Sequence, residues 1–96
     1  MNLREIAEEL GLNYSGEYGK NNSYVIDLYT DKEFGKVYSL LDRNEEVEQL
    51  EENNLLTVHN ASLIYLYKDR YQINLKSNFD TDEYSIILTD LGEQND

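Results

Sequence analysis

The stretch SLIYLYKDRYQINLK, residues 62–76, decides the fold. Its apolar run ends at Lys68-Asp69-Arg70, a polar tripeptide that predicts a tight turn. After the turn, apolar Tyr71, Ile73 and Leu75 alternate with polar side chains, which is typical of a strand with one buried face and one wet face. The stretch therefore predicts neighbouring antiparallel strands in a sheet that is covered on one side.

The same pattern extends to both sides of this stretch. Residues 77–82 predict a polar loop, and the alternation over 84–88 predicts a final strand, so the second half of the chain forms a three-stranded meander. The segment 56–67 is long for one strand, and Asn60-Ala61-Ser62 fits a bulge or a turn. These residues are compatible with one strand or with two.

The first half of the chain alternates between helical and strand composition. Apolar residues recur at helical spacing over 2–12, whereas SYVIDLYT, residues 23–30, is β-branched and aromatic. In that strand Val25, Asp27 and Tyr29 share one face. The predicted elements are a helix over 2–12, a loop over 13–22, a strand over 23–30, a hairpin loop over 31–35, a strand over 36–41 and a helix over 43–54.

The predicted order is thus α-β-β-α-β-β-β, which indicates an α+β fold. The stable arrangement for this order is an antiparallel sheet of about five strands with two helices on one face. We expect residues 1–96 to form a single small acidic domain, in which residues 92–96 are a flexible tail.

Charge is the strongest functional signal in the composition. The chain has 20 Asp and Glu, eight Lys and Arg, and a formal net charge of -12. Such a protein repels nucleic acid and anionic lipid and attracts basic surfaces. We therefore expect a basic protein partner, neither nucleic acid nor membrane as direct partners, and a homodimer as one possible assembly.

Few residues suit catalysis or metal binding. There is no Cys, and His59 is the only histidine, so thiolate sites and histidine clusters are excluded. Asp80-Thr81-Asp82-Glu83 lacks the spacing of an EF-hand. We predict no catalytic residue, no metal, no cofactor and no enzymatic activity. The chain also shows neither a signal peptide nor a long apolar run, so we expect a cytoplasmic protein, in the host cytoplasm if it is phage-encoded.

The acids gather in residues 42–52 and 77–96. On the predicted helix over 43–54, Glu45, Glu48 and Glu52 would share one face at intervals comparable to those between phosphates. Two loop tyrosines are additional contact candidates, because Tyr buries area at low entropy cost. The predicted partner-binding residues are Glu45, Glu48, Glu51, Glu52, Asp80, Asp82, Glu83, Tyr14 and Tyr18.

The acidic segments RNEEVEQLEE and DTDEY and the loop NYSGEYG carry a resemblance. In these features the chain resembles small acidic phage-encoded anti-defence proteins, including anti-CRISPR inhibitors that mimic DNA. The resemblance implies an inhibitor that blocks the nucleic-acid-binding surface of a CRISPR effector nuclease or another DNA-binding protein. The alternatives are an immunity protein that neutralises a basic toxin nuclease and a structural or assembly protein with a Tyr-rich sheet surface.

Overall fold

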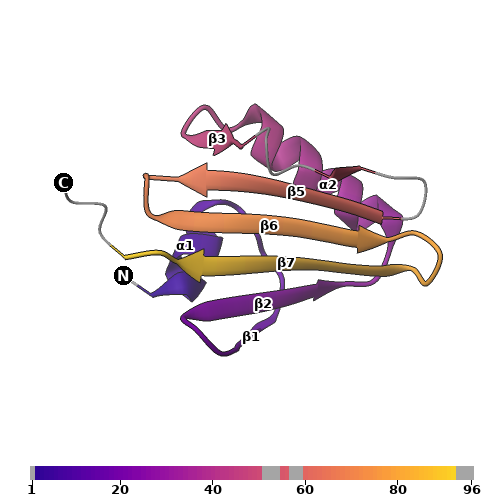
Figure 1. Ribbon diagram of the computed structural model, residues 1–96, viewed down its shortest axis with the longest axis horizontal. Helices are drawn as coiled ribbons and strands as arrows, with labels where there is room; N and C mark the ends of the chain where they lie inside the picture. The colour runs from indigo at the N-terminus through magenta and orange to yellow at the C-terminus, as the bar shows by residue number, and fades with distance from the viewer. Residues whose placement is uncertain (1, 51–54, 57–59, 93–96) are drawn as a thin grey trace.

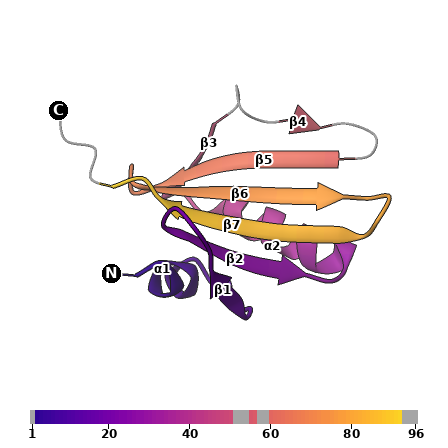
Figure 2. The same ribbon diagram turned by 60° about the horizontal axis from the view of Figure 1, so that its bottom comes forward.

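The computed structural model describes residues 2–50, 55–56 and 60–92, which form an α+β fold (Figure 1). Both helices lie on the same side of an antiparallel sheet (Figure 2), so the predicted fold class is confirmed. The elements are α1 (Leu3–Glu9), β1 (Gly16–Tyr18), β2 (Ser23–Leu28), α2 (Asp31–Arg43), β3 (Val47–Gln49), β4 (Leu55–Leu56), β5 (Asn60–Tyr67), β6 (Tyr71–Asn78) and β7 (Glu83–Asp90).

The sheet order among the described residues is β1-β2-β7-β6-β5-β3, and β4 also pairs with β5. The predicted meander is present as β5, β6 and β7, and both central residues of the predicted turn, Lys68 and Asp69, have positive φ values of 55° and 53°. β7 pairs with β6 on one side and with β2 on the other. The last strand of the described chain therefore lies in the middle of the sheet.

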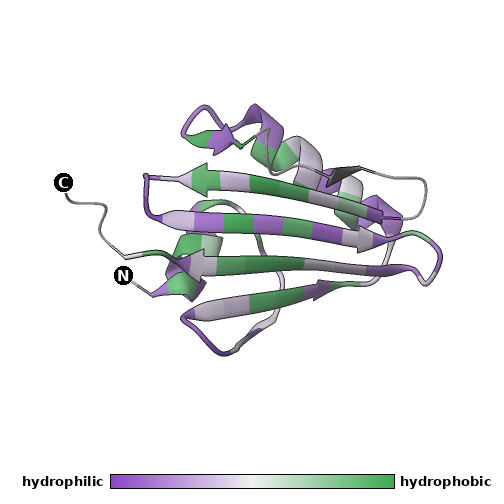
Figure 3. Cartoon of the chain, viewed as in Figure 1, coloured by the Kyte–Doolittle hydropathy of each residue, from purple (hydrophilic) through white to green (hydrophobic). Residues whose placement is uncertain are grey.

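The core lies between the sheet and the two helices. Alternate residues of β2, β5, β6 and β7 are buried. Along β6 hydrophilic and hydrophobic residues also alternate (Figure 3). α1 contributes Leu3, Ile6 and Ala7, and α2 contributes Val37 and Leu41. The alternation that predicted one buried face in 71–76 and 84–88 is thus confirmed in both strands.

Residues 31–43 form α2, so the predicted hairpin loop over 31–35 and strand over 36–41 are wrong. The Thr30 hydroxyl accepts a hydrogen bond from the Glu33 backbone N at 3.1 Å, which caps the helix. Phe34, Val37 and Leu41 then follow at helical spacing and pack on the core. The period of this apolar spacing favours a helix over the strand that the β-branched and aromatic residues suggested.

The predicted helix over 43–54 is also wrong within the described residues. α2 ends at Arg43 and is followed by the cap residue Asn44, whose side chain accepts a hydrogen bond from the Glu46 backbone N at 2.9 Å, and β3 comes next. Val47 pairs with Tyr67 of β5 and packs against the core. Val47 is β-branched and suits a strand, whereas the glutamates around it would repel one another on a helix. Both effects favour the strand. Residues 51–54 lie outside the described part.

Three smaller predictions concern the segments between these elements. The segment 56–67 contributes to two strands, because Leu56 of β4 pairs antiparallel with Ala61 of β5. The predicted loop over 13–22 contains the short strand β1, which pairs with β2. In the predicted tail over 92–96, only Gly92 lies within the described residues.

Gly35 offers a test of the corrected helix. It lies inside α2, and a Cβ at this position would have nothing within 4 Å. We expect Gly35→Ala to stabilise the fold by about 0.5–1 kcal/mol, because Ala loses less backbone entropy in a helix. Thermal unfolding monitored by circular dichroism should show a midpoint higher by roughly 2–6 °C.

Gly11→Ala is the matched control, because Gly11 has a φ of +81° and a Cβ there would lie 3.3 Å from Leu40 Cδ2. This variant should lower the midpoint. A Gly35→Ala variant that unfolds as early as Gly11→Ala would contradict the helical assignment of residues 31–43.

Candidate binding surface

The face of the sheet that points away from α1 and α2 is uncovered by any described residue (Figure 2). Half-buried apolar side chains run across its middle. Val25 of β2 pairs with Ile87 of β7, and Ile87 and Ile64 of β5 flank Asn74 of β6. Leu66 extends this row along β5. We call Val25, Ile64, Leu66 and Ile87 the apolar stripe.

Exposed carboxylates border the apolar stripe. Glu17 of β1 pairs with Val25, and Glu48 of β3 pairs with Leu66, so both acids share the uncovered face with the stripe. Asp27 of β2 and Glu83 of β7 lie on the same face at the end of the sheet that carries the β6–β7 turn. We call Glu17, Asp27, Glu48 and Glu83 the acidic rim.

The acidic rim is not neutralised within the described chain. None of its four carboxylates forms an ion pair or a side-chain hydrogen bond with another described residue. Among the described residues of β1, β2, β3, β5, β6 and β7, Lys76 of β6 is the base on this face. An apolar centre surrounded by polar and charged groups is the usual anatomy of a protein interface.

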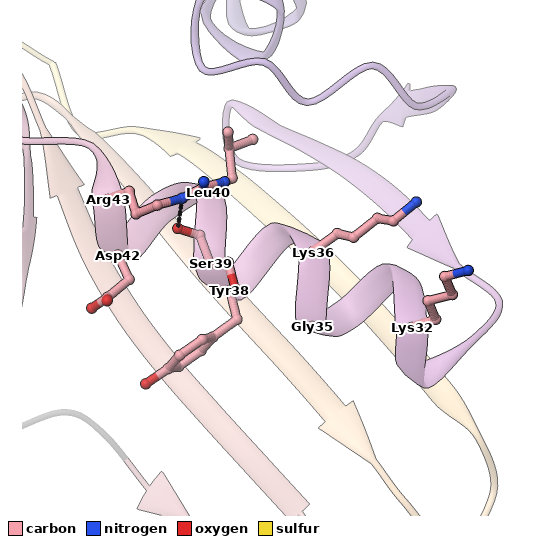
Figure 4. A pocket seen from close by; sticks show the side chains of 8 residues that line it. All are labelled: Lys32, Gly35, Lys36, Tyr38, Ser39, Leu40, Asp42 and Arg43. Atoms are coloured by element: carbon pink, nitrogen blue, oxygen red, sulfur yellow. Dashed lines mark hydrogen bonds between the residues drawn. The ribbon is translucent and has the colours of Figure 1, made fainter.

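Bases lie instead on the helical side of the sheet. A broad, shallow hollow on α2 is lined by Lys32, Lys36 and Arg43 together with Asp42 (Figure 4), and Arg43 Nε donates a hydrogen bond to the Ser39 backbone O at 3.2 Å. α2 contains three acids and three bases, so it has no net charge. This hollow is therefore a poor match for a strongly basic partner.

Two other acids already have basic partners near the β5–β6 turn. Lys68 Nζ lies 3.0 Å from Glu9 Oε1, and Arg70 binds both carboxylate oxygens of Asp90, at 2.9 and 3.1 Å. Hydrogen bonds from Lys68 and Tyr67 lower the pKa of Glu9, and hydrogen bonds from Arg70 and the Gly92 backbone N lower the pKa of Asp90. Glu9 and Asp90 are therefore paired with bases of the same chain, whereas the four acids of the acidic rim are not paired with any described base.

The predicted acidic residues occupy two separate regions. Glu48 lies in β3, at the end of the sheet that carries the β5–β6 turn. Glu83 lies at the other end, beside the exposed Asp80 and Asp82 of the β6–β7 turn. Asp82 accepts a hydrogen bond from the Tyr84 hydroxyl at 3.3 Å.

The predicted charged helix face is not formed. Glu45 is exposed in the turn before β3 and Glu48 lies in that strand, so they are not neighbours on a helix. Glu51 and Glu52 lie outside the described residues.

The structure does not bring Tyr14 and Tyr18 to the acidic rim. Tyr14 is half-buried and packs against the core on the helical side. Tyr18 pairs with the buried Tyr24, its ring lies 4.9 Å from that ring, and its hydroxyl accepts a hydrogen bond from the Arg4 backbone N at 3.3 Å. Both tyrosines have evident packing roles, and a contact with a partner remains a prediction.

Several residues of this surface, among them Glu17, Asp27 and Tyr29, were not among the predicted binding residues. Asp27 and Tyr29 follow Val25 along the uncovered face, and Tyr29 is 77% exposed. The sequence feature that could have identified Asp27 and Tyr29 is the alternation in SYVIDLYT, which placed Val25, Asp27 and Tyr29 on one face of a strand. That face proves to be the one that no described element covers.

Comparison of the chain with protein families, with curated proteins and with solved structures gives no match. Within residues 2–50, 55–56 and 60–92, no group of three His, Cys, Asp or Glu side chains is arranged to hold a metal ion. No helix in these ranges has both the length and the apolar character required to cross a membrane.

Proposed function

We propose that this protein is an acidic inhibitor that binds the basic nucleic-acid-binding surface of a partner protein and blocks it by DNA mimicry. A CRISPR effector nuclease or another DNA-binding protein would be such a partner. The chain acts without catalysis, because its carboxylates simply occupy the Lys and Arg side chains that otherwise contact phosphates.

The acidic rim around the apolar stripe is the observation that carries this proposal. Glu17, Asp27, Glu48 and Glu83 are exposed and have no basic partner among the described residues, whereas Glu9 and Asp90 do. Carboxylates of this kind attract basic surfaces over about one Debye length, which is about 8 Å at physiological salt. The apolar stripe then supplies the water-excluded centre that a stable contact needs.

The proposal is tested by capture and competition. The immobilised chain is incubated with a bacterial lysate at low salt, and bound proteins are eluted with a duplex DNA oligonucleotide. We expect DNA to release nucleic-acid-binding proteins, because DNA and the inhibitor compete for one surface. Proteins that leave only when salt is raised, and that DNA does not displace, would contradict DNA mimicry.

The apolar stripe also favours a second function, assembly through the uncovered sheet face. Exposed apolar patches often mark sites of self-association. However, two copies that meet at this face would bring their acidic rims together, and like charges oppose that contact. Sedimentation of the protein at low and high salt distinguishes the two functions, since self-assembly through the stripe should increase as salt screens the rim.

A further inference from the structure

Three shallow hollows form a continuous trough across the uncovered face, at the end of the sheet that carries the β6–β7 turn. The first and second share Asp27 and Tyr29, and the second and third share Glu83 and Ser85. Their volumes are about 270, 260 and 310 Å³. The trough crosses β1, β2, β7, β6 and β5, a span of roughly 20 Å at the usual distance between strands.

Tyr29 is the exposed aromatic residue of this trough. Asp27 lies two residues before it on the same face, and Glu83 lies across from it, because Leu28 pairs with Tyr84. The Tyr29 backbone N donates a hydrogen bond to Glu33 Oε1 at 3.0 Å, which fixes the residue between β2 and the capped start of α2. An exposed aromatic ring on a fixed backbone thus lies close to two exposed carboxylates.

The charge of the trough changes along its length. The first two hollows, over β1, β2 and β7, are lined by the acids Glu17, Asp27, Asp82 and Glu83 and by no base. In the third hollow, over β6 and β5, Lys76 lies together with Glu83. A bound segment would therefore meet negative charge at one end and a positive charge at the other. This asymmetry favours a polar chain that carries its cation at the β2–β7 end.

We propose that the trough binds an extended basic segment of the partner protein, with an arginine side chain on Tyr29 between Asp27 and Glu83. Arginine fits better than lysine, because a planar guanidinium can stack on an aromatic ring while it donates hydrogen bonds to a carboxylate. Lys76 at the other end suits a carbonyl or carboxylate of the same segment. This inference rests on the proposed function and specifies where its partner is held.

The test uses the full chain and two defined probes, acetylated and amidated hexa-arginine and hexa-lysine. Each is titrated into nitrogen-15-labelled protein at about 50 mM salt, where charge attraction is only partly screened. We expect the amide signals of Asp27, Tyr29 and Glu83 to shift most. Tyr29→Ala should weaken hexa-arginine binding about fivefold and hexa-lysine binding less than twofold, since the lost interaction is the stacked guanidinium.

Two variants control this measurement. Tyr29→Phe should bind hexa-arginine like the parent, because the ring face remains. Tyr38→Ala removes an exposed tyrosine from α2, outside the trough, and should have no effect. The amide spectra of all variants without peptide report whether the fold is intact.

The failures of the two proposals are distinguishable. If DNA displaces captured proteins but hexa-arginine shifts signals mainly at residues 44–48, or binds Tyr29→Ala as tightly as the parent, the trough proposal is overturned while DNA mimicry stands. If DNA displaces captured proteins but neither peptide binds, the trough proposal is likewise overturned while DNA mimicry stands. If DNA displaces nothing, the proposed function itself fails.

Discussion

Ile86→Asp should abolish cooperative unfolding of the entire domain. Ile86 is fully buried in β7, between Ile26 of β2 and Leu75 of β6. A carboxylate there has no cation to pair with and would be removed from water, which costs several kcal/mol or more. Because native domains are stable by only about 5–15 kcal/mol, this loss is comparable to the total.

The measurement is thermal unfolding by circular dichroism, with Thr89→Asp as the matched control. Thr89 lies on the same strand but on the uncovered face, where the added charge stays in water. The control should retain a sigmoidal transition, whereas Ile86→Asp should give none. An Ile86→Asp protein that melts cooperatively near the parent's midpoint would show that β7 is not the central strand.

Reversal of charge at the acidic rim should cause the largest loss of binding to a DNA-displaceable partner. We expect the double variant Asp27→Lys with Glu83→Lys to weaken affinity about 30-fold or more, at roughly 1 kcal/mol or more for each reversed contact. The dissociation constant is measured by surface plasmon resonance at two salt concentrations.

Glu8→Lys with Asp42→Lys is the matched control for this experiment. Each double variant changes the net charge from -12 to -8, so general attraction to a basic partner is reduced equally. Glu8 and Asp42 are exposed on α1 and α2, on the other side of the sheet. Equal losses in both variants would mean that net charge, and not the uncovered face, determines binding.

The strands of the sheet could be predicted from the sequence more reliably than the second helix. Strict alternation over 71–76, and apolar residues at every second position over 84–88, identify strands with one buried face, because a period of two has few competing explanations. Over 31–43 the cap at Thr30 and the apolar spacing from Phe34 were both visible. They compete with a Gly35 that is typical of a turn and with Val37 and Tyr38, which are common in strands.

The candidate surface could be predicted only in part, because it is assembled from distant segments. Asp27 and Glu83 become neighbours through the pairing of β2 with β7, whereas Glu48 reaches the same face through β5, at the opposite end of the sheet. No local sequence pattern specifies which strands are adjacent when the order of strands in the sheet differs from their order in the chain. The concentration of acids in the chain is a property of composition, whereas their arrangement on one face follows from topology.

The central position of β7 also constrains how the chain folds as it leaves the ribosome. β1 and β2 reach the β5–β6 hairpin within the sheet only through β7, so the sheet remains in two pieces until residues 83–90 have been synthesised. Closure then joins segments about sixty residues apart, such as Tyr24 and Leu88, and long-range pairings of this kind slow folding. Until that strand inserts, β2 and β6 expose open edges, which makes the nascent chain vulnerable to aggregation during this interval.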